Sequence, residues 1–250
     1  MSKSLLLIRL IPNLLTFAAL AVGFGALRFA LDGAWEKAVW CVILADILDM
    51  LDGRVARLLK VSSPFGVEID SLADLINFGA VPALIVYLWS APLIEAQSIK
   101  FLLWSAGSFY LICAAIRLAK FNLLAHNIRS EKGIRYFFFG VPSSVGAILA
   151  LVPVMWDFDL ADHFNYHMKG SIFLVPYLIL VGVLMASRIP TFSLKFIRIS
   201  QEYIWILLIA FALLILALIL YPWYLLPVCT VLYLVSIVFS ILFFERLKGK

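Results

Sequence analysis

The acidic residues of this 250-residue chain are concentrated in one short segment. Six of its fifteen aspartates and glutamates lie between Asp46 and Asp74, in otherwise apolar surroundings. Their spacing follows the period of an α-helix, in which residues three, four, seven or eight positions apart share one face. The residues spaced in this way are Asp49, Asp52, Gly53, Ala56 and Arg57 in the first half of the segment, and Gly66, Asp70 and Asp74 in the second.

Four of these carboxylates are expected to meet and to hold metal ions. A short turn at residues 61–65 joins the two helices, so the helices should run antiparallel with their acidic faces together. Carboxylates repel one another strongly at low dielectric constant unless they are protonated or bind cations. Two divalent cations are therefore predicted as cofactors, Mg²⁺ or Mn²⁺, with Ca²⁺ able to occupy the site, and such a pair is a usual clamp for displacement at phosphorus. The four predicted ligands are Asp49, Asp52, Asp70 and Asp74.

Small residues beside the acidic positions leave room for a ligand. Gly53, Ala56 and Gly66 carry no bulky side chain, so a nucleotide could approach the backbone there. Arg57 is placed to bind a phosphate in the same groove. Taken one at a time, small residues in membrane helices also serve close helix packing. Asp46, one turn before the first of the four aspartates, is expected to support the site rather than to bind metal.

The elements that must position these residues are membrane helices. Hydrophobic residues make up 64% of the chain and charged residues 14%, with a mean hydropathy of +1.06, whereas soluble domains carry about 25% charged residues. Eight apolar runs reach the roughly 20 residues that span a bilayer as a helix, and they lack the alternation of barrel strands. The predicted fold is all-α, a polytopic membrane helical bundle of about eight spans. The runs cover residues 11–31, 35–59, 67–92, 99–122, 138–156, 171–188, 203–221 and 223–243.

Lysine and arginine are distributed unevenly between the two sides that eight spans create. Cytoplasmic loops carry the excess of these residues, so both termini and the acidic site are predicted to face the cytoplasm of a bacterial-type inner membrane. Anionic membrane lipids are the expected partners of this basic face, and no nucleic acid is expected. The predicted cytoplasmic cations are Lys3, Arg9, Arg54, Arg57, Lys60, Arg117, Lys120, Arg129, Lys132, Arg135, Arg188, Lys195, Arg198, Arg246, Lys248 and Lys250; the opposite side has Arg28, Lys37, Lys100 and Lys169.

The acidic segment resembles the complete signature of the CDP-alcohol phosphotransferase family. The resemblance implies a six-helix catalytic core over residues 1–200, so that residues 201–250 would form two additional transmembrane helices. It also implies two divalent cations, a CDP-linked donor and a homodimer. The signature reads Asp49-x2-Asp52-Gly53-x2-Ala56-Arg57-x8-Gly66-x3-Asp70-x3-Asp74 in this sequence.

The resemblance also implies a role for each residue of the signature. In the family, the first three aspartates bind one ion, and the first, third and fourth take part at the other. The fourth, here Asp74, is the expected general base. The family positions that admit the cytidine correspond to Gly53, Ala56 and Gly66.

Segments within and outside the signature resemble the membrane-embedded bacterial phosphatidylserine synthases. This resemblance implies transfer of a phosphatidyl group from CDP-diacylglycerol to L-serine with release of CMP, in which the serine hydroxyl attacks phosphorus and Asp74 accepts its proton. The signature itself does not separate serine from glycerol 3-phosphate, inositol phosphate or choline, which stay open as acceptors. A cation transporter is a more distant alternative, because intramembrane aspartates mark ion pathways, but its site is expected at the bilayer midplane. The segments are residues 11–16, 52–57, 63–74, 117–122, 139–143 and 187–191.

Several further polar residues are candidates for ligand contacts. Four cations could hold the serine carboxylate or the lipid phosphate, although anchoring at the cytoplasmic surface explains them as well. Asn13 and Thr16 in the first span are expected, by family analogy, to approach the nucleotide. Helix capping after Pro12 would explain those two residues equally well. The four cations are Arg117, Lys120, Arg135 and Arg188.

Overall fold

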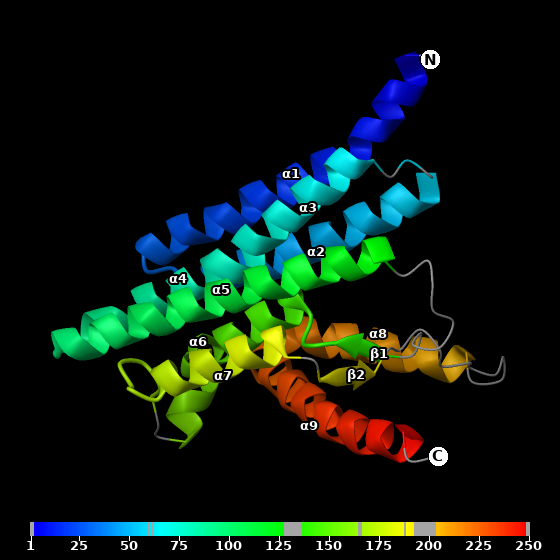
Figure 1. Ribbon diagram of the computed structural model, residues 1–250. Coiled ribbons are helices and arrows are strands. Elements are labelled where there is room, and N and C mark those ends of the chain that lie inside the picture. The colour runs from blue at the N-terminus through cyan, green and yellow to red at the C-terminus, as the bar shows by residue number, and fades with distance from the viewer. Residues whose placement is uncertain are drawn as a thin grey trace.

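The computed structural model describes residues 3–59, 61, 63–127, 137–164, 167–187, 189–192 and 204–248. Over these residues the chain is a bundle of helices with one pair of short strands (Figure 1), which confirms the predicted all-α membrane fold. Four helical segments are long and apolar enough to cross a membrane, judged by length and composition. They are Leu10–Leu31, Pro64–Leu93, Gln97–Leu123 and Ser143–Ala161. The total of eight spans stays a prediction.

The first two helices form the hairpin that carries Asp49 and Asp52. α1 (Lys3–Leu31) packs along α2 (Trp35–Leu59). The turn between them uses Gly33, whose φ of +72° lies in the left-handed region that favours glycine. The buried residues of the two helices are mostly small, which lets membrane helices approach closely; they include Ala19, Ala26 and Ala30 of α1 and Ala38, Val39, Val42 and Ala45 of α2.

The third predicted span is a rod of four helical segments. Ser63 caps its start, since its hydroxyl accepts a hydrogen bond from the Gly66 amide at 3.0 Å, and Pro64 suits the first helical position. The rod therefore begins three residues before the predicted start at 67. Its segments are α3 (Pro64–Asp74), the π-helical turn η1 (Leu75–Ala80), α4 (Val81–Ser90) and the short 3₁₀ turn η2 (Ala91–Leu93).

Three helices and the strand pair complete the region around the acidic residues. The strands pair antiparallel, with Phe138 opposite Thr191. The fifth span was predicted to begin at 138, and this is wrong, because the chain first forms a strand and then turns at Gly140, whose φ is +79°. The elements are α5 (Gln97–Asn127), β1 (Phe137–Phe139), α6 (Ser143–Phe164), α7 (Leu174–Ala186) and β2 (Pro190–Phe192).

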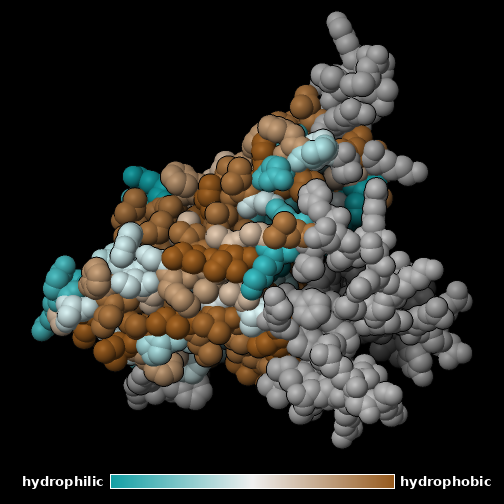
Figure 2. Space-filling model, in the orientation of Figure 1, coloured by the Kyte–Doolittle hydropathy of each residue, from teal (hydrophilic) through white to brown (hydrophobic). Residues whose placement is uncertain are grey.

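The last two helices lie beside this bundle. α9 (Pro222–Lys248) packs against α6 and β2, and α8 (Ile204–Leu220) contacts α9, as Figure 1 shows. Apolar side chains cover most of the face in Figure 2, with hydrophilic residues at its left end and beside the grey residues on the right. A surface of this kind suits a lipid environment. The boundary between a core of residues 1–200 and an addition of residues 201–250 stays a prediction.

Candidate metal and nucleotide site

Three of the four predicted carboxylates meet between α2 and α3. Asp49 and Asp52 come from one face of α2, and Asp70 comes from α3. One oxygen from each lies within 4.8 Å of the others. The hairpin around the Ser63 cap turns the chain back on itself, so residues about 20 positions apart face each other. The helical spacing thus predicted the convergence of these three residues correctly.

Thr16 of α1 holds the second aspartate in place. Its hydroxyl donates to Asp52 Oδ2 at 2.5 Å and lies 3.1 Å from the Pro12 carbonyl oxygen. Both side chains of the Thr16–Asp52 pair are buried, so this contact fixes one carboxylate oxygen and leaves the other for a further ligand. Thr16 was predicted to approach the nucleotide, and it also lines the groove described below.

Asp74 lies one turn beyond the three-carboxylate group. It interacts with Asp49 across the helix interface and with the guanidinium of Arg117 on α5. The hydroxyl of Ser143, the first residue of α6, donates to Asp74 Oδ2 at 3.3 Å. Asp74 Oδ1 is buried and has no hydrogen-bond partner among the described residues. Sequence reasoning missed Ser143 as a site residue, although the segment 139–143 had been singled out.

A groove opens beside the acidic residues. It is bounded by α1, by the end of α2 and by the start of α3, and it includes all the small residues predicted to admit a nucleotide. Arg57 is exposed and is not among the lining residues, so its phosphate contact stays a prediction. The lining residues are Pro12, Asn13, Thr16, Asp52, Gly53, Ala56, Val61, Ser63, Gly66, Val67 and Asp70.

Two glycines of the groove serve different purposes. A Cβ atom at Gly66 would lie 2.9 Å from Asn13 Oδ1 and 3.2 Å from Ser63 Oγ, so this glycine lets α1 and α3 approach each other. A Cβ atom at Gly53 would meet nothing within 4 Å, because it would project into the groove. Gly66 is thus explained by packing, whereas Gly53 keeps space open for a ligand.

This difference leads to an expected result for Gly53→Leu. A leucine there fills the groove, so kcat/KM for a nucleotide-linked substrate should fall by about 10-fold or more. Gly25→Leu is the matched control, because a Cβ atom at Gly25 also meets nothing within 4 Å and Gly25 does not line the groove. Steady-state kinetics of both variants would check this, and equal kcat/KM values would contradict the role given to Gly53.

The four candidate cations have different surroundings. Arg117 is partly buried and acts on Asp74. Lys120 is exposed, and its Nζ donates to the Ala186 carbonyl oxygen at 2.8 Å, so it ties the end of α5 to the end of α7. Arg135 and Arg188 lie outside the described residues.

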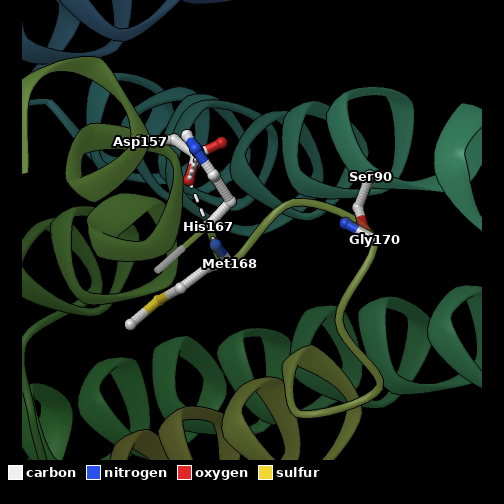
Figure 3. A network of polar contacts seen from close by, with 5 residues as sticks. All are labelled: Ser90, Asp157, His167, Met168 and Gly170. Carbon is white, nitrogen blue, oxygen red and sulfur yellow. Dashed lines mark hydrogen bonds and ion pairs between the residues drawn. The ribbon is translucent and has the colours of Figure 1, made fainter. Parts of the chain in front are cut away.

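A second polar network lies at the other end of the third span. Asp157 Oδ1 accepts a hydrogen bond from the Met168 amide at 3.1 Å and lies 3.6 Å from His167 Nδ1, and the Gly170 amide donates to Ser90 Oγ at 3.0 Å (Figure 3). These contacts hold the loop between α6 and α7 against the end of α4. The network therefore has a structural explanation and is separate from the acidic site.

The three-carboxylate group fits divalent cations. Its donors are all hard oxygen atoms, which suit Mg²⁺, Mn²⁺ and Ca²⁺. Among the described residues, no lysine or arginine forms an ion pair with Asp49, Asp52 or Asp70. Carboxylates this close in an apolar bundle need a cation or protons to offset their repulsion. The open groove beside them would give a metal-bound phosphate access.

Comparison with known proteins gives consistent results. The family model of the CDP-alcohol phosphatidyltransferases matches residues 9–175, and a second model, CDP-alcohol phosphatidyltransferase 2, matches residues 202–237. The chain is similar to CDP-diacylglycerol–serine O-phosphatidyltransferases of Mycobacterium leprae (31% identity, covering 94% of this chain and 75% of the relative) and of Helicobacter pylori (36% identity, 74% and 73%). An archaetidylserine synthase of Methanothermobacter thermautotrophicus is 29% identical over 55% of this chain and 54% of its own length. Since the first model covers well over half of the sequence and both acidic helices, the chain belongs to the CDP-alcohol phosphatidyltransferase family.

Proposed function

We propose that this protein transfers a phosphatidyl group from CDP-diacylglycerol to L-serine, giving phosphatidylserine and CMP. The acidic group beside an open groove carries the reaction class, because it fits metal-assisted displacement at phosphorus. The choice of serine rests on the relatives, which carry the name CDP-diacylglycerol–serine O-phosphatidyltransferase. Family membership sets the transporter alternative aside.

The acidic residues would hold two divalent cations, Mg²⁺ or Mn²⁺. When bound, these ions would neutralise charge on the diphosphate as the P–O bond to CMP breaks. Asp49, Asp52 and Asp70 supply the oxygen ligands, with Asp74 as a further ligand. Thr16 keeps the Asp52 carboxylate oriented through its hydrogen bond of 2.5 Å.

Asp74 is the proposed general base. Ser143 engages its Oδ2, while Oδ1 has no partner among the described residues, so Oδ1 is available for a proton. The serine hydroxyl oxygen forms a bond to the phosphorus that bears diacylglycerol. The bond from that phosphorus to the CMP oxygen breaks, and the hydroxyl proton passes to Asp74. Arg117 of α5 brings a positive charge close to this carboxylate.

The groove is the proposed nucleotide site. Asn13, Gly53 and Ala56 line it next to Asp52, so a cytidine there would place its diphosphate beside the carboxylates. Gly66 also lines the groove, and Arg57, one position after the lining residue Ala56, is a candidate phosphate ligand. Arg117, and with it Lys120, Arg135 and Arg188, are candidates for the acceptor carboxylate or the lipid phosphate.

The proposed setting is the inner membrane of a bacterial-type cell. The uneven distribution of lysine and arginine supports cytoplasmic termini and a cytoplasmic site. Lipid tails would then stay in the bilayer, while CMP and serine exchange with the cytoplasm. The resemblance to the family supports a homodimer.

The test is CMP release by purified protein in detergent with CDP-diacylglycerol and Mn²⁺, with and without L-serine. Release should require serine and should stop with EDTA. Release that ignores serine but responds to glycerol 3-phosphate, inositol phosphate or choline would reject serine and keep the reaction class. Release that continues unchanged in EDTA would reject the metal-assisted reaction.

A further inference from the structure

The helix that carries Asp70 and Asp74 changes its type directly after Asp74. The π-helical turn η1 follows at Leu75–Ala80, and the Val81 amide donates to the Ile76 carbonyl oxygen, five residues back. A π-helical turn holds one residue more than an α-helical turn, and such turns are frequent at functional sites. The extra residue rotates everything beyond it by about 100°, the angle per residue of an α-helix.

This rotation decides which way the acidic face points. In an unbroken α-helix, residues 7 and 11 positions after Asp74 would lie on the same face as Asp74 itself. Those residues are Val81 and Ile85, both fully buried in the bundle core. The π-helical turn separates the two faces, so the acidic face of α3 can turn toward α2 while the apolar face of α4 stays in the core.

One side chain from α5 supports the turn at its weakest point. Pro82 has no amide hydrogen, so the Phe78 carbonyl, four residues earlier, lacks the donor that an α-helix would supply. The hydroxyl of Tyr110 donates to that carbonyl oxygen at 2.7 Å. Both Phe78 and Tyr110 are buried, with 1% and 0% of their surface exposed, so water cannot replace this bond.

Close packing holds the turn from two sides. A Cβ atom at Gly79 would lie 2.9 Å from Leu111 Cδ1 and 3.3 Å from the Cβ of Ala114, both on α5. On the other side, Gly23 of α1 lies directly against the buried side chain of Asn77. The π-helical turn therefore has little room to move, and its packing against α5 sets its position.

The same face of α5 reaches the acidic site. Tyr110, Ala114 and Arg117 are four and seven positions apart and so share one face. Arg117 acts on Asp74, one helical turn before the Phe78 carbonyl that Tyr110 binds. Tyr110 and Asp74 are thus connected through one turn of helix and through one face of α5.

We propose that Tyr110 is a positioning residue for the acidic site: its bond to the Phe78 carbonyl fixes the π-helical turn and thereby the orientation of Asp70 and Asp74. Tyr110 itself touches neither substrate nor metal. The inference rests on the proposed function only for its kinetic readout, because the orientation of the carboxylates can also be followed by Mn²⁺ binding.

The chain offers a matched control for this bond. Tyr177 donates to the Leu149 carbonyl oxygen, also at 2.7 Å, and Leu149 lies four residues before Pro153 in α6. Each tyrosine thus satisfies a carbonyl that a proline has left without a donor. Only the Tyr110 bond involves the helix that carries Asp70 and Asp74.

The experiment compares Tyr110→Phe with Tyr177→Phe in the full-length protein. Each change removes one hydrogen bond to a backbone carbonyl, fully buried at Tyr110 and partly buried at Tyr177, so both should lower thermal stability. Only Tyr110→Phe should lower kcat, by about 10- to 100-fold, the cost of a misplaced catalytic group, and it should weaken Mn²⁺ binding measured by electron paramagnetic resonance without substrate. Equal kcat values and equal Mn²⁺ binding in the two variants would overturn the proposal.

A double variant separates support of the helix from positioning. Pro82→Ala restores an amide that can donate to the Phe78 carbonyl, so Pro82→Ala/Tyr110→Phe should regain thermal stability. It does not restore the tie to α5, so kcat and Mn²⁺ binding should stay low. Recovery of both would show that Tyr110 is only structural. If the wild-type protein released no CMP, the proposed function would fail, while Mn²⁺ binding would still decide the role of Tyr110.

Discussion

Replacing Asp74 with asparagine should lower CMP release by about 100- to 10,000-fold, the range that a general base contributes. Asparagine has nearly the same shape as aspartate but cannot accept the hydroxyl proton of the acceptor. Its amide can still contact the Ser143 hydroxyl, which now lies 3.3 Å from Asp74 Oδ2. The fold should therefore persist. Release of CMP by purified protein, with thermal unfolding measured in parallel, would check both parts of this expectation.

Asp159→Asn provides the control for this variant. Asp159 is an exposed residue of α6. Its replacement removes the same charge at a place away from the site, so the turnover of Asp159→Asn should match that of the unaltered protein. If Asp74→Asn retained normal turnover, Asp74 would have no part in the reaction. If both variants lost turnover equally, the loss would result from the change in net charge rather than from removal of the general base.

Replacing Asp70 with asparagine should weaken Mn²⁺ binding by about 10-fold or more, since even residues behind the ligands change metal affinity 10- to 100-fold. Asp70 is one of the three carboxylates whose oxygen atoms lie within 4.8 Å of one another. A neutral amide removes one negative charge and one strong oxygen donor. The measurement is Mn²⁺ titration followed by electron paramagnetic resonance, with CMP release recorded over the same range of Mn²⁺ concentration.

Glu68→Gln is the matched control on the same helix. Glu68 lies two positions before Asp70 and is exposed, and residues two apart in a helix do not face the same way. Its Mn²⁺ titration should be unchanged. Equal titrations for both variants would remove Asp70 from the metal site, even if activity fell.

Local features of the site could be predicted from the sequence. The helical spacing of Asp49, Asp52 and Asp70 gave the face of each helix, because the α-helical period is a property of neighbouring residues. The Ser63 and Pro64 pair marks a helix start by the usual capping chemistry, although the predicted span began later. Similarly, the apolar composition decided the membrane fold, since strands with free edges cannot cross a bilayer.

Element boundaries near the strand pair were less predictable. The segment from 137 to 142 is as apolar as the helix that follows, so hydropathy placed the start of the predicted span at 138. The structure instead pairs Phe137–Phe139 with Pro190–Phe192, segments about 50 positions apart. Strand pairing over such a distance depends on where α6 and α7 bring the chain, which no local pattern records.

The sequence by itself determined the apolar helices, the acidic faces and the family signature, because each depends on the types and spacing of residues near one another in the chain; even the signature spans only residues 49–74. Only the tertiary structure decided which side chains reach those faces from elsewhere. Thr16 meets Asp52 across 36 positions, Tyr110 meets the Phe78 carbonyl across 32, and Ser143 meets Asp74 across 69. These contacts depend on how helices cross and rotate against one another, and a single extra residue in the turn after Asp74 rotates a helix by about 100° without changing the apolar pattern around it.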